Sequence, residues 1–171
     1  VTFDRTAPTV TIATVAGDNV LNAAESGAAQ TVSGTATGAE DGQTVTVALN
    51  GKTYSATVSN NAWSLSIPSA DLLALTDGGT FTITANLSDV AGNAATQATR
   101  SLSVDRTAPT VSIAAVAGDD VLNAAESGVA QTVSGVTSGV EDGQTVTVTL
   151  NGKTYSATVT NNAWSLTVSS A

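Results

Sequence analysis

The amino-acid sequence predicts an all-β chain built from tandem two-sheet sandwiches. Hydrophobic residues make up 42% of the 171 residues but aromatic residues only 4%, and the small residues Ala, Val, Thr and Ser dominate. Small β-branched residues of this kind favour strands. Short alternating runs, separated by turns that contain Gly or Asn, recur over about 100 residues, which is typical of an immunoglobulin-like β-sandwich of about seven strands.

The chain is an internal repeat. The heptapeptide DRTAPTV stands at residues 4–10 and again at 105–111, so the period from Asp4 to Asp105 is 101 residues. This period suits one small domain and is too long for a solenoid turn. We therefore expect three segments: residues 1–3 as the tail of a preceding repeat, 4–104 as a complete repeat, and 105–171 as a second repeat truncated before its last two strands.

The first part of the repeat predicts a strand, a loop and a second strand. Val10–Thr14 alternates apolar and polar residues, as does its copy at 111–115, and each run is typical of a half-buried first strand. The loop at 16–27 contains a possible helical turn around Asn22–Glu25. The second strand is expected at Ala29–Thr35, before the turn-rich segment GAEDG.

A β-hairpin is the clearest local signal. The runs Thr44–Leu49 and Thr53–Val58 both alternate, and Asn50 and Gly51 stand between them. Asn-Gly favours a type I′ turn, because both central residues must take a positive φ. The sequence therefore predicts the third and fourth strands as a tight hairpin.

The rest of the repeat predicts three more strands, at Ala62–Ile67, Thr80–Leu87 and Thr96–Val104. Between the first two of them, Ser69 is expected to cap a short helical turn. Trp63 alternates with Leu and Ile residues, and we assign it and its copy Trp164 to the core rather than to a sugar-stacking surface.

Composition excludes several classes of function. Fourteen acidic residues face five basic ones, and the net charge of −9 disfavours nucleic acid and anionic lipid as partners. The absence of Cys excludes disulfides and thiolate metal sites. No apolar run approaches the roughly 20 residues that span a bilayer, so we expect no membrane insertion.

All fourteen acids lie outside the predicted strands. For any one carboxylate a solvated surface position is at least as good an interpretation as a functional one. Sandwich topology, however, sends the acids of the linkers and loops to two ends of the domain, where those of neighbouring repeats would meet. Close carboxylates repel, and a hard divalent cation reverses the sign of that interaction. Oxygen ligands on flexible loops, without His or Cys, predict Ca²⁺.

Five motifs in order resemble the bacterial Ig-like repeats of giant non-fimbrial adhesins of Gram-negative bacteria: DRTAPTV, AGDDVLNAAESG, EDGQTVTVTLNGKTY, NNAWSL and SDVAGN. The resemblance covers essentially the whole chain. It implies a long stalk of similar domains that is exported by type I secretion, serves biofilm formation or host attachment, and is stiffened by Ca²⁺ at domain junctions.

The resemblance implies a first set of Ca²⁺ ligands in the linker, the first loop and the SDVAGN motif: Asp4, Asp18, Asp89, Asp105, Asp119 and Asp120. Acids that the topology places at the same ends complete the candidate set: Glu25, Asp41, Glu126 and Asp142. Asn19 stands where the second copy has Asp120, so weaker binding is expected in the first copy.

The leading hypothesis is a structural spacer of an extracellular, surface-attached adhesin, with neighbouring repeats of the same chain as partners. A host or matrix ligand is then not expected to bind this segment directly. The alternative is a glycan- or receptor-binding Ig-like module, which would need an exposed aromatic cleft. An enzyme is not expected, because Glu40 and Asp41 are neighbours in a turn rather than an opposed pair of carboxylates.

Overall fold

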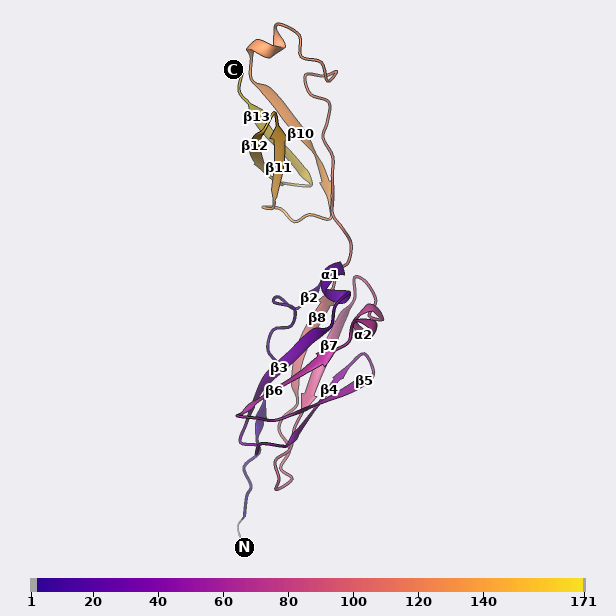
Figure 1. Cartoon of the computed structure of the whole chain (residues 1–171), viewed down its shortest axis with the longest axis vertical. Helices are drawn as coiled ribbons and strands as arrows, with labels where there is room; N and C mark the ends of the chain where they lie inside the picture. The colour runs from indigo at the N-terminus through magenta and orange to yellow at the C-terminus, as the bar shows by residue number, and fades with distance from the viewer. Residues whose placement is uncertain (1–2, 171) are drawn as a thin grey trace. The chain divides into compact units, whose positions relative to one another are not determined.

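The structure is a computed structural model that describes residues 3–170. These residues divide into two compact units, the first ending at Thr107 and the second beginning at Ala108 (Figure 1). Of the segment predicted to be the tail of a preceding repeat, Val1 and Thr2 lie outside the described residues, and Phe3 is exposed.

The first unit is a sandwich of two sheets. One sheet has the order β1-β3-β6 and the other the order β2-β8-β7-β4-β5 (Figure 1). The bounds are β1 Thr9–Val10, β2 Val20–Leu21, β3 Gln30–Thr37, β4 Thr44–Leu49, β5 Lys52–Thr57, β6 Ala62–Ile67, β7 Thr80–Asn86 and β8 Ala98–Val104. Neighbouring strands are antiparallel except β2 and β8, which are parallel. The predicted all-β sandwich is thus confirmed.

The core lies between the two sheets, and Trp63 on β6 is part of it. Its side chain is 3% exposed, and the indole Nε1 donates to the carbonyl oxygen of Thr11 at 3.2 Å. Gly34 on β3 makes this packing possible, because a Cβ atom there would lie 1.9 Å from the same oxygen. The assignment of Trp63 to the core is confirmed.

The predicted hairpin is present with its predicted turn. Asn50 has φ 49° and Gly51 has φ 76°, so both central residues take the positive values that the type I′ turn needs. Thr44 to Leu49 pair in order with Thr57 to Lys52. Local sequence was therefore sufficient to fix this register.

Two details of the first unit differ from the sequence-based expectations. The predicted loop at 16–27 contains the extra strand β2, where Leu21 is fully buried beside β8. Two residues are too few to show alternation, so only the distant strand reveals it. The predicted cap at Ser69 is wrong: helix α2 (Ser69–Leu73) includes that residue, and Pro68 takes the N-cap position without a side-chain hydrogen bond.

The helical turn predicted in the first loop is present as α1 (Ala23–Ser26). The predicted first strand is paired as regular strand only at Thr9–Val10, although the amides of Thr11 and Ala13 continue to donate to β3 carbonyls. Among the described residues, no helix has the length and apolar character needed to span a membrane.

The second unit repeats part of this architecture. Its strands are β9 Thr110–Val111, β10 Gln131–Ser138, β11 Thr145–Leu150, β12 Lys153–Thr158 and β13 Ala163–Val168, with a 3₁₀ turn at Glu126–Gly128. They form a sheet in the order β13-β10-β9 and the hairpin β11-β12. Trp164 is 3% exposed and packs with Val133 and Ala157, as predicted for a core residue.

Candidate functional site

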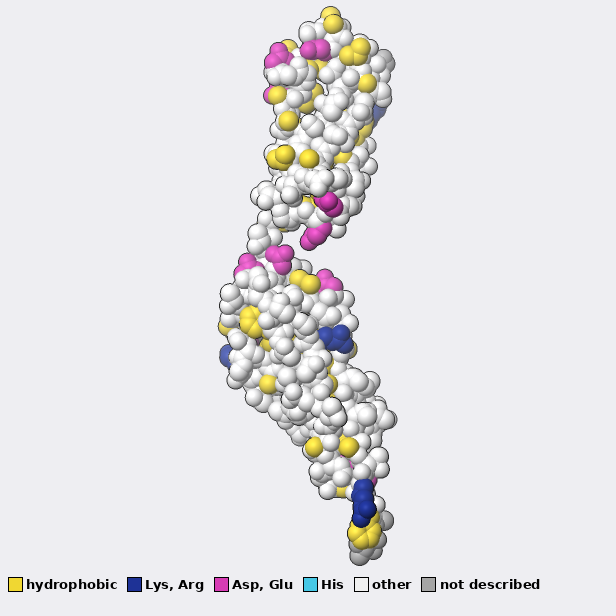
Figure 2. Space-filling model, turned by 180° about the vertical axis from the view of Figure 1, so that it is seen from behind, with side chains coloured by type: hydrophobic (Ala, Val, Ile, Leu, Met, Phe, Trp, Pro, Cys, Tyr) yellow, Lys and Arg dark blue, Asp and Glu magenta, His cyan; other side chains and the backbone are white. Residues whose placement is uncertain are grey.

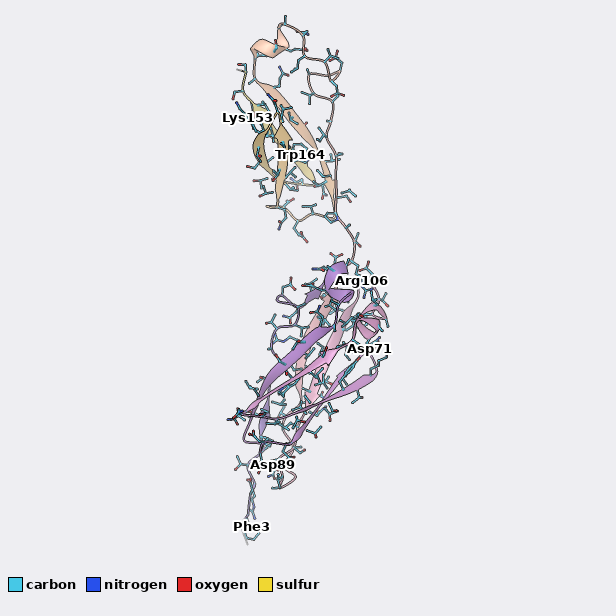
Figure 3. All side chains as sticks on the ribbon, viewed as in Figure 1. Phe3, Asp71, Asp89, Arg106, Lys153 and Trp164 are labelled. Atoms are coloured by element: carbon cyan, nitrogen blue, oxygen red, sulfur yellow. The ribbon has the colours of Figure 1, made fainter. Side chains whose placement is uncertain are left out.

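The acidic side chains lie at the ends of the strands rather than along them. All fourteen occupy linkers, loops or helical turns of the described structure, and on the face seen in Figure 2 they gather toward the ends of each unit. The first unit therefore has an N-terminal end, near Asp89, and a C-terminal end, near Arg106, both labelled in Figure 3.

At the N-terminal end, Asp89 follows β7 and is only 4% exposed. Its carboxylate accepts hydrogen bonds from the amide of Asn93 at 2.7 Å and from its side-chain Nδ2 at 2.8 Å. The hydrogen bond from the Asn93 side chain is the main cause that holds the pKa of Asp89 below its ordinary value. The loop is thereby built around a buried carboxylate that stays charged.

The linker and the β3–β4 loop meet this loop. The Asn93 Nδ2 atom lies 3.4 Å from the carbonyl oxygen of Asp4, and the amide of Val90 donates to Glu40 Oε2 at 3.0 Å. Three segments distant in sequence thus converge beside Asp89. The sandwich topology predicts both Glu40 and Asp41 at this end, but the predicted ligand set contains Asp41 and not Glu40.

Asp41 has a different contact, which its copy repeats. Its Oδ1 accepts the amide of Asn60 at 2.8 Å, and Asp142 accepts the amide of Asn161 at 2.8 Å. These amides belong to turns in which Asn60 and Asn161 each have φ 51°. Asp41 therefore holds the β3–β4 loop against the turn before β6. Asp142 holds the β10–β11 loop against the turn before β13 in the same way.

At the C-terminal end, the carboxylate of Asp77 accepts hydrogen bonds from the linker. Its Oδ1 accepts the amides of Arg106 at 2.7 Å and Gly78 at 3.1 Å, and its Oδ2 lies 3.4 Å from the Thr107 hydroxyl. Asp105 itself accepts the amide of Thr107 at 3.0 Å, as Asp4 accepts that of Thr6 at 2.9 Å. The two copies of the linker motif begin with the same local turn.

The first-loop acids also serve the backbone. Asp18 accepts the amide of Val20 at 2.9 Å, and Asp119 accepts that of Val121 at 3.0 Å. Asn19, with φ 67°, and Asp120, with φ 64°, each accept an amide four residues earlier. Asn and Asp tolerate this left-handed conformation better than most residues. The replacement of Asn19 by Asp120 in the second copy therefore leaves the local backbone structure unchanged.

Glu25 belongs to a capping box at the start of α1, and Glu126 makes the same pair of bonds with Asn123, although the 3₁₀ turn of the second unit begins at Glu126 with Ala125 at its N-cap position. The amide of Asn22 donates to Glu25 Oε2 at 3.0 Å, while Asn22 Oδ1 accepts the Glu25 amide at 2.9 Å. Asn123 and Glu126 make the same reciprocal pair, at 3.0 Å in both directions. Such a pair satisfies two amides that the helix leaves without internal partners.

All ten predicted calcium ligands therefore accept a backbone amide in this structure. A carboxylate offers about four acceptor positions, so those that accept a single amide keep capacity for another contact. Their oxygen chemistry fits Ca²⁺, which takes 6 to 8 oxygen ligands. Within residues 3–170, however, the acids form no group of three or more with the spacing of a metal site. The donors fit the ion, but they are not assembled into a cage.

One cluster of charged and polar side chains was not predicted from the sequence. Asp71, at the start of α2, forms an ion pair with Lys52 and accepts the Tyr54 hydroxyl at 2.7 Å. The hydrogen bond from Lys52 is the main cause that lowers the pKa of Asp71. Burial, followed by the bond to Asp71, raises the pKa of Tyr54 to about 12. Lys52 and Tyr54 share a face of β5 because they are two residues apart, but nothing in the sequence places Asp71 beside them.

The chain is similar to solved repeats of bacterial adhesins. It is 35% identical to a structure from a 1.5-MDa bacterial ice-binding adhesin, with a TM-score of 0.62 and coverage of 95% of this chain and 54% of that one. It is 41% identical to a Ca²⁺-stabilized adhesin with which an Antarctic bacterium binds ice, with a TM-score of 0.59 and coverage of 98% and 42%. The chain thus spans about half or less of the length of these relatives.

A comparison with curated proteins finds no match. A sequence model of the bacterial Ig-like domain matches residues 15–106, which is more than half of the chain. This match covers β2 to β8 of the first unit and ends in the linker that Asp77 holds. The sandwich topology, the internal repeat and the family match agree, and the chain belongs to the bacterial Ig-like domain family.

Proposed function

We propose that this chain is a structural spacer within the stalk of a bacterial cell-surface adhesin, with neighbouring repeats of the same protein as its partners. The observation that carries the proposal is the similarity to adhesin repeats over 95% and 98% of the chain, together with the internal period of 101 residues. On this proposal the chain contributes length and stiffness rather than catalysis, and the whole protein contributes to attachment or biofilm formation from outside the cell.

Calcium at the linker ends of each repeat is the finer part of the proposal. It is supported by the loop carboxylates that surround the linker at Asp4, and by the calcium stabilisation of the similar Antarctic adhesin. Asp89, Glu40 and the carbonyl oxygen of Asp4 are the groups we assign to the N-terminal end. Asp77 and Asp105 are their counterparts at the other end.

The alternative, a glycan- or receptor-binding module, has less support. Trp63 and Trp164 are both buried, so neither indole offers a stacking surface. Recognition of small ligands ordinarily uses a concave, largely apolar site with a few directed polar groups. A glycan array with the full chain would favour the alternative if it gave saturable binding.

Thermal unfolding tests the calcium proposal. An ion that binds only the folded state raises the melting temperature, and we expect the first unit of the full chain to melt higher in millimolar Ca²⁺ than in EDTA. For extracellular modules the affinity is on the order of 10⁻⁴ to 10⁻³ M. Asp89→Asn should remove most of the calcium increment.

Asp71→Asn is the matched control, because Asp71 bonds to Lys52 and Tyr54 rather than to the linker. We expect it to leave the calcium increment unchanged while lowering the melting temperature equally in both buffers. Identical melting curves of the unmodified chain in EDTA and in Ca²⁺ would contradict the calcium proposal and leave the spacer function standing.

A further inference from the structure

Arg106, the second residue of the repeated linker motif, reaches back onto the first unit. Its Nη2 donates to the carbonyl oxygen of Leu72 at 2.6 Å, and its Nη1 donates to that of Leu75 at 3.0 Å. Leu72 and Leu75 are 1% and 2% exposed. The carbonyl of Leu72 belongs to the last turn of α2, where it also accepts the amide of Leu75 at 3.1 Å, and the carbonyl of Leu75 lies just beyond the helix. The C-terminal end of a helix favours a cation. The guanidinium therefore caps a segment that is anchored in the core.

Asp77 holds the same linker from its backbone side. It accepts the amide of Arg106 at 2.7 Å, and the amide of Asp105 donates to the carbonyl oxygen of Leu21 at 3.0 Å. Leu21 is fully buried on β2. The segment 105–107 is thus bonded on one side to β2 and on the other to the α2–β7 connection.

We propose that Arg106 and Asp77 form a metal-independent clamp, which makes residues 105–107 part of the folded body of the first repeat and leaves the joint to the next repeat at Ala108 and Pro109. The clamp is built from hydrogen bonds within one unit, so it operates whether or not the end of the repeat binds calcium. Calcium, on the function proposed above, would then act on a linker whose first three residues are already fixed.

The contact with two carbonyl oxygens at once requires the guanidinium group of Arg106. A planar guanidinium presents several donors in a fixed fork and can serve two carbonyls at once, whereas a lysine ammonium is a single point charge. Arg5 holds the same position in the first copy of the motif and is exposed in this chain. It therefore provides a control with the same sequence context and the same change of charge.

Amide hydrogen exchange and ¹⁵N relaxation of the full chain in EDTA test the clamp. We expect the amides of Asp105 and Arg106 to be protected, with order parameters near the roughly 0.85 of rigid backbone through Thr107 and lower values at Ala108. Arg106→Gln should accelerate exchange at residues 105–107 by about tenfold or more, because bonds to charged groups are among the strong ones. Arg106→Lys should fall between the two, and Arg5→Gln should leave these amides unchanged.

Asp77→Ala removes the other half of the clamp without touching the α2 carbonyls, and it should release the same amides. It keeps the test decisive if Arg106→Gln unfolds the first unit. Exchange at 105–107 that stays within about twofold in both variants would overturn the proposal. Loss of protection in the unmodified chain on adding EDTA would also overturn it, because the linker would then depend on a metal.

Discussion

Residues 4–70 and 105–171 carry nearly the same sequence, yet corresponding side chains of the two units differ in burial. Leu49 is 2% exposed in the first unit and its copy Leu150 is 51% exposed in the second. The tryptophans do not differ, because Trp63 and Trp164 are each 3% exposed. The tryptophans are thus buried by nearby strands that both units contain. Burial of Leu49, by contrast, needs strands that lie far away in the sequence.

The strand pairing explains the difference. In the first unit β4 pairs with β5 on one side and β7 on the other, and Ile83 and Leu102 of β7 and β8 are fully buried. In the described part of the second unit, β11 pairs with β12. Each tryptophan, by contrast, packs over the strand that precedes it by about 30 residues, in the same register in both units.

The largest effect should come from Leu49→Ala and its matched variant Leu150→Ala. Deleting a buried leucine side chain costs about 2–5 kcal/mol of unfolding free energy, and we expect this for the first unit. Leu150 is half exposed, and we expect a cost below about 1 kcal/mol in the second unit. Native-state hydrogen exchange of the full chain reads the two units separately. Equal costs would mean that a partner covers Leu150 in solution.

Much of the fold could be predicted from the sequence, and the hairpin shows why. Asn50 and Gly51 define their turn through their own backbone preferences, and the flanking alternation then sets the register. Strand β2 could not be predicted, because Val20 and Leu21 become a strand only through β8, about 80 residues later. Likewise, α2 begins at Ser69 because the helix end is set by packing of Leu72 rather than by a capping side chain.

The next effect concerns the glycine beneath each tryptophan. A Cβ atom at Gly34 would lie 1.9 Å from the carbonyl oxygen of Thr11, and at Gly135 1.8 Å from that of Ser112. The backbone must move to accept it, and overpacking of this kind costs about 1–3 kcal/mol. We expect Gly34→Ala and Gly135→Ala to destabilise their own units by similar amounts, measured by exchange of the Trp63 and Trp164 amides. A much smaller cost in the second unit would show that its tryptophan packs more loosely.

The two reciprocal Asn–Glu pairs should give a smaller effect. Asn22 and Asn123 make the same reciprocal bonds with Glu25 and Glu126. Loss of an N-cap side chain costs about 0.5–2 kcal/mol, which we expect for Asn22→Ala, and Asn123→Ala should likewise increase local exchange in its own loop because it removes the same pair of bonds. If Ca²⁺ restores the loop in either variant, the glutamate serves as an ion ligand as well as a cap.

The candidate site was less predictable than the fold. Sequence topology correctly sends Asp4 and Asp89 to one end of the first unit, where Asn93 connects them. It gives no reason to choose Glu40 over Asp41, because adjacent residues in a turn point to different neighbours. The hydrogen bond from Arg106 to the carbonyl oxygen of Leu75 could not be predicted either. Every residue has a backbone carbonyl, and the sequence does not indicate which one a side chain contacts.

The smallest effect at neutral pH concerns Tyr54, whose raised pKa of about 12 has no consequence until the phenol ionises. An ordinary tyrosine ionises near 10. Because folding raises this pKa, the contribution of neutral Tyr54 to stability is fully present below about pH 10 and is lost as the pH rises toward 12. In a Tyr155→Phe background, ultraviolet absorbance follows the phenolate of Tyr54 alone. Asp71→Asn should move that titration to lower pH, because it removes the negative acceptor that opposes ionisation. An unchanged titration would assign the shift to burial alone.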